Sequence, residues 1–137
     1  MDINPYLTFD GNARAALEFY ADALEGRIEA VQTFGEIPDM PPMEDAMAAR
    51  LAHGRVIFEG GTLMVSDTWA PEPGHTFSGF SIQTSWDTPD DARAAFDRLS
   101  AGGEIVMPME KTFWAAAFGL CKDRFGVQWM CNCDNPA

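Results

Sequence analysis

The chain has 137 residues, of which 47% are hydrophobic, and its formal net charge is −12, from 21 acidic and 9 basic residues. A chain of this length and apolar content can bury a core without disulfides or a structural metal, so we do not expect disorder. The acidic balance argues against nucleic acid and anionic membranes as partners, because both bind basic surfaces. Acidity serves solubility in most proteins; the alternative here is a cationic ligand drawn in by the field of the chain.

The sequence predicts a cytoplasmic protein. Its first residues, MDINPYLTFDG, have neither the basic nor the apolar region of a secretory signal. No apolar run approaches the ~20 residues that span a bilayer.

The first half of the chain reads as a strand, a helix and three strands. PYLTF predicts the first strand, and a segment with helical periodicity follows it. The residues that repeat at helical spacing, and so share one buried face, are Ala13, Ala16, Leu17, Tyr20 and Leu24. Gly26 offers this helix a left-handed stop. The next three strands are predicted by RIEAVQTF, ARLAHGRVIFEG and TLMVSD, with a turn at Gly60-Gly61 between the last two.

A loop interrupts this half, because GEIPDMPPMEDAM has three prolines in five residues and proline lacks a backbone donor. Two interpretations stay open. The loop is either a mobile lid over a site or a plain surface insertion. If it closes over a site, it brings four acidic residues with it: Glu36, Asp39, Glu44 and Asp45.

The second half repeats this order. FSGFSIQTSW (residues 77–86) predicts the fifth strand, and the ARAA of residues 13–16 recurs at residues 92–95 inside a second helix. Thr88 suits the N-cap of this helix, Pro89 its first position, and Gly102-Gly103 its end. The last three strands are predicted by EIVMPM, FWAAAFGLCK and VQWMCNC, with a turn at residues 123–126.

Two strand-helix-three-strand (βαβββ) modules, about residues 1–68 and 76–137, therefore predict an α+β fold with curved mixed sheets. We expect a single domain over residues 1–137.

Several stretches of the chain resemble a known family. They are NPYLTFDGNARAALEFY, TFGEIP, HGRVIFEGGTLMVSD and TFWAAAFGLCKDRFGVQWMCN. With the duplicated module, they resemble the PhnB-like branch of the vicinal oxygen chelate superfamily, which includes glyoxalase I, bleomycin-resistance proteins and dihydroxybiphenyl dioxygenase. The resemblance implies an open cup lined by the concave faces of the strands, and a homodimer in which a neighbour completes each cup.

For enzymes of that superfamily, the resemblance also implies a divalent metal held by His, Glu or Gln on the first, fourth, fifth and eighth strands, where it acts as a Lewis acid. The matching positions carry Pro5 and Tyr6, no such residue in 62–66, Phe80 with Gln83 near it, and Met130. We therefore expect no metal and no cofactor. His53 is the only weak candidate ligand, and both it and His75 are more simply hydrogen-bonded structural residues.

All three cysteines lie near the end of the sequence. Alternation along the last strand places Trp129, Cys131 and Cys133 on one face, opposite Met130. If Met130 points into the cup, these cysteines point toward the helices as small buried hydrophobes. A turn at Arg124-Phe125 would place Cys121 opposite Gln128, out of reach of the other two. We predict three free, buried thiols.

A metal-free cup would bind by apolar contact. The residues expected to line it are Tyr6, Phe34, Phe58, Met64, Phe80, Trp114 and Met130. Ordinary core packing is the alternative role for these aromatic residues. The leading hypothesis is a protein that binds a small, flat, neutral or cationic molecule. A metal-dependent glyoxalase- or dioxygenase-type enzyme is the second, and a dimeric interaction protein with a vestigial pocket is the third.

Overall fold

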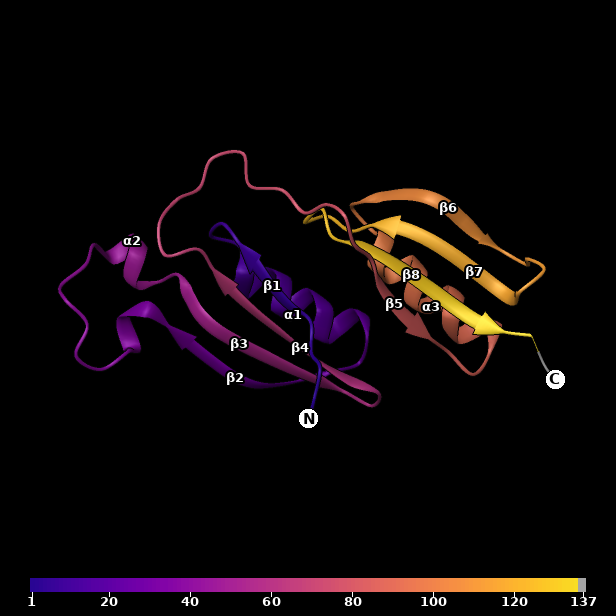
Figure 1. The fold of residues 1–137 in the computed structure, drawn as a ribbon, viewed down its shortest axis with the longest axis horizontal. Coiled ribbons are helices and arrows are strands. Elements are labelled where there is room, and N and C mark those ends of the chain that lie inside the picture. The colour runs from indigo at the N-terminus through magenta and orange to yellow at the C-terminus, as the bar shows by residue number, and fades with distance from the viewer. Residues whose placement is uncertain (136–137) are drawn as a thin grey trace. The chain divides into compact units, whose positions relative to one another are not determined.

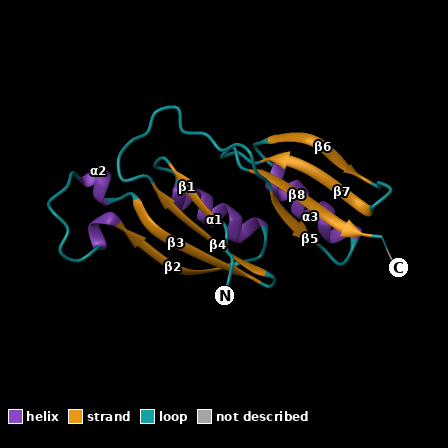
Figure 2. Ribbon diagram, viewed as in Figure 1, coloured by secondary structure: helices purple, strands orange, loops and turns teal. Residues whose placement is uncertain are grey.

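The computed structural model describes residues 1–135. The chain divides after residue 75 into two compact units, here called unit 1 (Met1–His75) and unit 2 (from Thr76 onward). Each unit is a four-stranded sheet with one long helix against it (Figure 1; Figure 2). The α+β fold and its two βαβββ modules are therefore confirmed.

Unit 1 forms a sheet with the strand order β1-β4-β3-β2, in which β1 and β4 are parallel and the other pairs antiparallel. Its elements are β1 (Tyr6–Phe9), α1 (Ala13–Ala23), β2 (Arg27–Thr33), a 3-10 helix (Phe34–Glu36), α2 (Asp45–Ala48), β3 (Leu51–Phe58) and β4 (Gly61–Asp67). The proline-rich loop thus lies between the 3-10 helix and α2.

Unit 2 repeats this topology with the strand order β5-β8-β7-β6. Its elements are β5 (Ile82–Ser85), α3 (Pro89–Ser100), β6 (Glu104–Glu110), β7 (Ala115–Lys122) and β8 (Gln128–Asp134). Here β5 and β8 are the parallel pair. In the part of the chain that is described, no helix is long and apolar enough to cross a membrane.

The core of each unit lies between its helix and one face of its sheet. In unit 1 the helix side is formed by Ala13, Ala16, Leu17, Tyr20 and Ala23, which are almost fully buried. The sheet side includes Val56, Leu63 and Val65. Each fully buried Val or Leu side chain contributes about 1.5–3 kcal/mol to stability. Since this packing uses one face of the sheet, the other face stays open.

The end of α1 differs from the predicted stop at Gly26. The left-handed residue is Glu25, with φ 55°, and the Gly26 N–H donates to the Ala21 carbonyl at 2.8 Å. Gly26 is needed for space: a Cβ there would lie 2.5 Å from the ring of Phe58 and 2.7 Å from Val56.

The start of α3 confirms its predicted cap. The Thr88 hydroxyl accepts a hydrogen bond from the Asp91 N–H at 3.1 Å, and Pro89 occupies the first turn. Such a cap typically stabilises a helix by ~1 kcal/mol.

The fifth strand is shorter than predicted. It spans Ile82–Ser85 rather than residues 77–86, because residues 77–81 form an irregular loop in which Gly79 has φ 83°. Phe80 therefore precedes the strand instead of lying on it.

The three cysteines are free and buried, as predicted. The register at the β7–β8 turn is not as predicted, because Cys121 lies opposite Trp129 and Lys122 lies opposite Gln128. The Asp123 N–H donates to the Val127 carbonyl at 2.8 Å, so the turn is a three-residue loop. This loop places Cys121 on the same buried face as Trp129 and Cys131, and all three thiols are free.

Candidate functional site

Each sheet has an open face, on the side away from its long helix. Across the open face of unit 1, one row of paired positions runs from Tyr6 through Met64 to Arg55. Across that of unit 2, the corresponding row runs from Gln83 through Met130 to Leu120. Met64 and Met130 thus occupy equivalent places in the two repeats, each beside the parallel strand of its unit.

A cavity of about 480 Å³ lies in unit 2. It is lined by Phe77, Ser78, Gly79, Phe80, Ser81, Lys122, Gly126, Gln128 and Met130. These residues come from the irregular loop before β5 and from the ends of β7 and β8 around the turn that joins them. The volume lies within the range of about 300–1,000 Å³ that is typical of small-molecule sites.

The cavity has aromatic and thioether groups on its apolar side. The rings of Phe77 and Phe80 pack edge to face, with their centroids 6.3 Å apart. Phe80 is 41% exposed, so part of its ring surface is free to meet a ligand. The Met130 thioether adapts to irregular apolar shapes.

Polar groups hold the loop against the sheet. The Gln128 amide donates to the Ser81 hydroxyl at 2.6 Å, which ties the loop before β5 to the first residue of β8. This bond fixes one edge of the cavity. Lys122, at the end of β7, brings the one formal charge among the residues that line it within the described chain.

Of the predicted pocket residues in unit 2, Phe80 and Met130 both line the cavity, whereas Trp114 does not. Trp114 packs edge to face against Phe113 and Phe118, with centroid distances of 4.7 Å and 5.4 Å. This cluster lies where β6 and β7 are joined, at the other end of β7 from Lys122.

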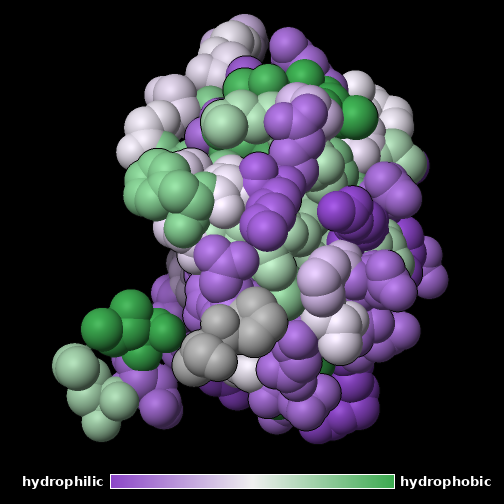
Figure 3. Space-filling model, turned by 90° about the vertical axis from the view of Figure 1, so that its right-hand side faces the viewer, coloured by the Kyte–Doolittle hydropathy of each residue, from purple (hydrophilic) through white to green (hydrophobic). Residues whose placement is uncertain are grey.

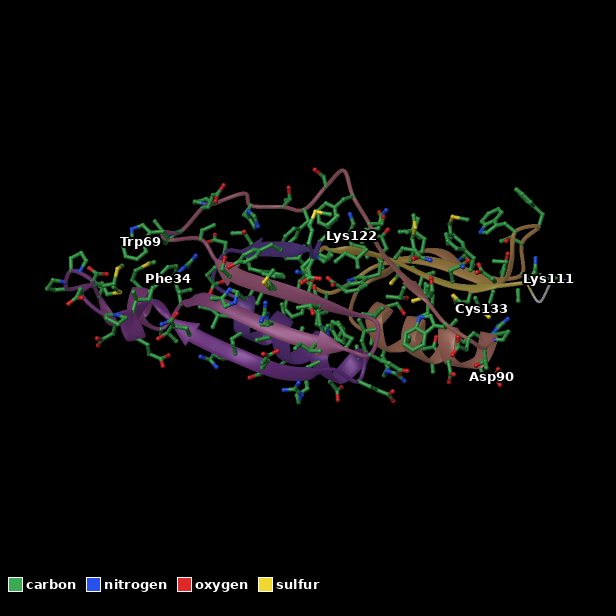
Figure 4. All side chains as sticks on the ribbon, turned by 60° about the horizontal axis from the view of Figure 1, so that its bottom comes forward. Phe34, Trp69, Asp90, Lys111, Lys122 and Cys133 are labelled. Atoms are coloured by element: carbon green, nitrogen blue, oxygen red, sulfur yellow. The ribbon has the colours of Figure 1, made fainter. Side chains whose placement is uncertain are left out.

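The predicted residues of unit 1 fall in separate places. Tyr6 lies beside Met64 on the open face, and its hydroxyl is hydrogen-bonded to His53 Nδ1 at 3.2 Å. Phe34 packs against Trp69, with the ring centroids 4.9 Å apart (Figure 4). Phe58 lies on the helix side of the sheet, beside Gly26 and Val56, and so is away from the open face.

One acidic residue of the proline-rich loop already has partners. The Glu36 carboxylate accepts hydrogen bonds from the Thr33 N–H at 3.1 Å and the Thr33 hydroxyl at 2.9 Å. These bonds lower the pKa of Glu36 below its ordinary value. Glu36 therefore closes the turn of the 3-10 helix.

The residues on the four strands do not fit the metal that the resemblance implies. Their open faces present Tyr6, Met64, Gln83 and Met130 in the two rows, and neither a phenol nor a thioether suits a hard cation. Within residues 1–135 no three His, Cys, Asp or Glu side chains gather into a metal-binding group. That the protein binds no metal stays a prediction.

The two histidines are engaged in hydrogen bonds. His53 lies on β3, outside the four strands, and its Nδ1 faces the Tyr6 hydroxyl. His75 Nε2 lies 2.6 Å from the Thr8 carbonyl oxygen, to which it donates. Both observations match the structural role expected for these residues.

Sequence reasoning missed most of the loop that lines the cavity, together with Lys122 and Gln128. Gly79 was the available signal, because a glycine inside a strand pattern marks a bulge or a turn. Lys122 is the last residue of β7, and no motif around it in the sequence marks it as a binding residue.

Comparisons with known proteins agree with this fold. A family model described as the Glyoxalase/Bleomycin resistance protein/Dioxygenase superfamily matches residues 2–131. The chain belongs to this superfamily, which confirms the resemblance seen in the sequence.

Among individual proteins, the chain is 33% identical to protein YjdN of Escherichia coli strain K12 over 140 residues, covering 96% of this chain and 95% of YjdN. The crystal structure of PA1353 from Pseudomonas aeruginosa superposes with a TM-score of 0.87 at 39% identity, over 99% of each chain. A PhnB protein from Bacillus cereus has a TM-score of 0.79 at 21% identity, covering 97% of this chain and 99% of its own. That last likeness is one of fold alone.

Proposed function

We propose that this protein binds a small, flat organic molecule in the cavity of unit 2, and that its role is to hold this molecule rather than to transform it. The observation that carries the proposal is the cavity of about 480 Å³, in which Phe77, Phe80 and Met130 supply the apolar contacts. Sequestration of a ligand is the analogy offered by bleomycin-resistance proteins, which give the superfamily part of its name.

The physical basis is a mostly apolar site with a few polar groups. Aromatic rings in offset or edge-to-face contact gain about 0.5–1.5 kcal/mol beyond the effect of buried area. Phe77 and Phe80 can make such contacts with a flat ligand, while Gln128 and Ser81 offer hydrogen bonds at one edge. The sequence also suggested a cationic ligand, but no carboxylate lines this cavity within residues 1–135, so its lining does not support one.

The metal-dependent enzyme is the weaker alternative. It requires ligand side chains that converge, and the described chain brings none together in a group of three.

We also propose that two copies of the chain associate. The supporting observation is the surface of β6 and the residues that follow it, where five large apolar side chains are exposed. They are Ile105 at 54%, Val106 at 47%, Met107 at 43%, Phe113 at 92% and Trp114 at 47%. Figure 3 looks onto the end of unit 2 where β6 and β7 are joined, and shows green hydrophobic surface among purple hydrophilic residues.

A cytoplasmic location, predicted from the sequence, is proposed here as well. Three free cysteines are consistent with a reducing compartment, where thiols persist.

The ligand proposal is tested first by native mass spectrometry of protein purified without a histidine tag. We expect a co-purified organic molecule and no stoichiometric metal. About one divalent metal per chain, lost in a His53→Ala variant, would instead favour the enzyme alternative.

The cavity itself is tested with matched variants and calorimetric titration of the co-purified molecule or of hits from a fragment screen. We expect Phe80→Ala to weaken binding at least about tenfold, which corresponds to 1.4 kcal/mol. Trp114→Ala is the control, because Trp114 is half-exposed and aromatic but lies outside the cavity. If Trp114→Ala weakened binding and Phe80→Ala did not, the ligand site would lie elsewhere.

A further inference from the structure

The cavity of unit 2 differs in charge from the chain that contains it. The chain carries 21 acidic residues and a net charge of −12. Yet among the described residues that line the cavity there is one lysine, Lys122, and no aspartate or glutamate. A cavity whose one charged lining residue is a lysine, in a strongly acidic protein, is suited to bind a negatively charged group of a ligand.

Lys122 has no carboxylate partner in the described part of the chain. Glu104 lies opposite it in the β6–β7 register, but no ion pair joins the two. Asp123, the next residue, is buried and is not among the residues that line the cavity. Its carboxylate accepts hydrogen bonds from the N–H groups of Phe125 and Val127 and from the Trp129 indole. The Lys122 ammonium is therefore available to a ligand.

The loop before β5 adds backbone donors. The N–H groups of Ser78, Gly79 and Phe80 have no hydrogen-bond partner within residues 1–135. A Cβ placed on Gly79 would have no atom within 4 Å, so this part of the loop borders open space. Backbone N–H groups without a partner, in a loop that borders the cavity, are donors that an anionic group can use.

We propose that the ligand of this cavity is an aromatic anion, such as an aryl carboxylate, with its ring against Phe77, Phe80 and Met130 and its charged group at Lys122. This inference rests on the proposed function and names its ligand class. It replaces the neutral or cationic ligand expected from the sequence. The net charge of the chain does little to repel an anion from a distance, because physiological salt screens exposed charges beyond about 8 Å. Within the cavity, the nearby ammonium decides the preference.

The experiment uses three probes of one shape: 2-naphthoate, its neutral amide, and 2-naphthylmethylamine, which is a cation. Each is titrated calorimetrically into the full chain at physiological and at raised salt. We expect 2-naphthoate to bind the most tightly, and we expect raised salt to weaken it while leaving the amide unchanged.

The chain offers a close control for the lysine, because Lys111 is its only other lysine and precedes β7 where Lys122 ends it (Figure 4). We expect Lys122→Gln to lower the affinity for 2-naphthoate about tenfold and to leave that for the amide unchanged. Lys111→Gln makes the same change in net charge and should alter neither. Glu104→Gln removes the carboxylate that lies opposite Lys122 in the β6–β7 register and should leave 2-naphthoate binding equal or stronger.

The outcomes separate the two proposals. If the amide or the amine binds as tightly as 2-naphthoate, with Phe80→Ala weakening all of them, the cavity binds ligands but the anion inference is wrong. Equal effects of Lys122→Gln and Lys111→Gln would also overturn it. If no probe binds and no molecule co-purifies, both proposals fail. Lys122 is exposed, so its variant should fold, and an unchanged unfolding temperature verifies this.

Discussion

Two buried aspartates, one in each unit, hold backbone segments in place by accepting several hydrogen bonds. The Asp67 carboxylate accepts hydrogen bonds from the N–H groups of Gly11, Ala13 and Leu51, at 2.7–3.0 Å. It thereby joins the start of α1 to the start of β3. Asp123 accepts three hydrogen bonds at the β7–β8 turn, one of them from the Trp129 indole at 2.8 Å. A buried N–H group without a partner costs about 1–3 kcal/mol, so each carboxylate satisfies groups that would otherwise oppose folding.

Cysteine burial has a consequence for reactivity. Burial raises the pKa of Cys121 to about 12, with the neighbouring Cys131 and Asp123 as smaller causes. Burial also raises the pKa of Cys131, although its hydrogen bond with Thr84 acts in the opposite direction. Because the thiolate is the reactive form, these thiols are almost fully protonated and inert near neutral pH.

We therefore predict slow thiol titration of the native protein at pH 8, reaching three thiols only after denaturation. The same pKa values predict a loss of stability in alkali. The native state keeps its Cys121 proton between pH 9 and about 12, where the unfolded thiol ionises, so unfolding is favoured as the pH rises through that range. A Cys121→Ala variant should lose this part of the pH dependence. Finding fewer than three thiols in denaturant without reductant would show a disulfide and contradict the prediction.

At the scale of elements, the β2–β3 side of unit 1 depends on a close approach between backbone and ring. Gly26 begins the path into β2, and the Phe58 ring at the end of β3 fills the space that a side chain there would need. Glycine is required at position 26 by packing and not by backbone conformation, since the left-handed residue is the preceding one, Glu25.

We predict that Gly26→Ala lowers the free energy of unfolding by about 1–3 kcal/mol, the usual cost of overpacking. Gly60→Ala is the control, because a Cβ at Gly60 meets no atom within 4 Å and its backbone is not left-handed. We expect this control to change stability by less than about 0.5 kcal/mol. Urea denaturation of the three proteins measures both effects. Equal midpoints would show that the Phe58 ring moves aside freely.

The sequence predicted the elements better than it predicted the site. Helical periodicity, the Thr88 cap and strand alternation report local preferences, and the structure follows them. The cavity depends instead on two features without periodicity. Residues 77–81 include two phenylalanines, which favour a strand, but form a loop. The Asp123 side chain holds a three-residue turn that shifts the β7–β8 register by one residue. Side-chain-to-backbone hydrogen bonds of this kind cannot be read from a pattern of apolar residues.

The two units share a topology but differ in the residues on their open faces, and this difference explains why the cavity forms in unit 2. The two open faces share a methionine in equivalent rows, yet unit 1 places the Tyr6–His53 pair beside it and unit 2 places the loop before β5. The duplicated topology supplies the open face, and the residues around the methionine then decide what each face can bind.

For the whole molecule, two features act on association in opposite directions. The exposed apolar surface along β6 favours contact between chains, and the large negative net charge disfavours it. β6 is an edge strand with unpaired backbone groups on one side, and such edges associate with other chains unless charges protect them. Glu104 and Glu110 stand at its two ends, while Ile105, Val106 and Met107 between them are exposed. Two chains of charge −12 repel each other, so association through this surface must depend on apolar contact.

We predict a homodimer whose stability rises with salt, because salt screens the repulsion between chains and leaves apolar burial intact. Light scattering at micromolar protein should give twice the 15.0 kDa of one chain. A Val106→Glu variant, which places a third carboxylate in the strand between Glu104 and Glu110, should shift the mass toward the monomer at the same concentration. A Thr62→Glu variant makes the same charge change on β4, an inner strand of unit 1, and should not. A mass of 15.0 kDa for the unaltered protein at both low and high salt would contradict the prediction, and would leave the β6 surface available to a different partner.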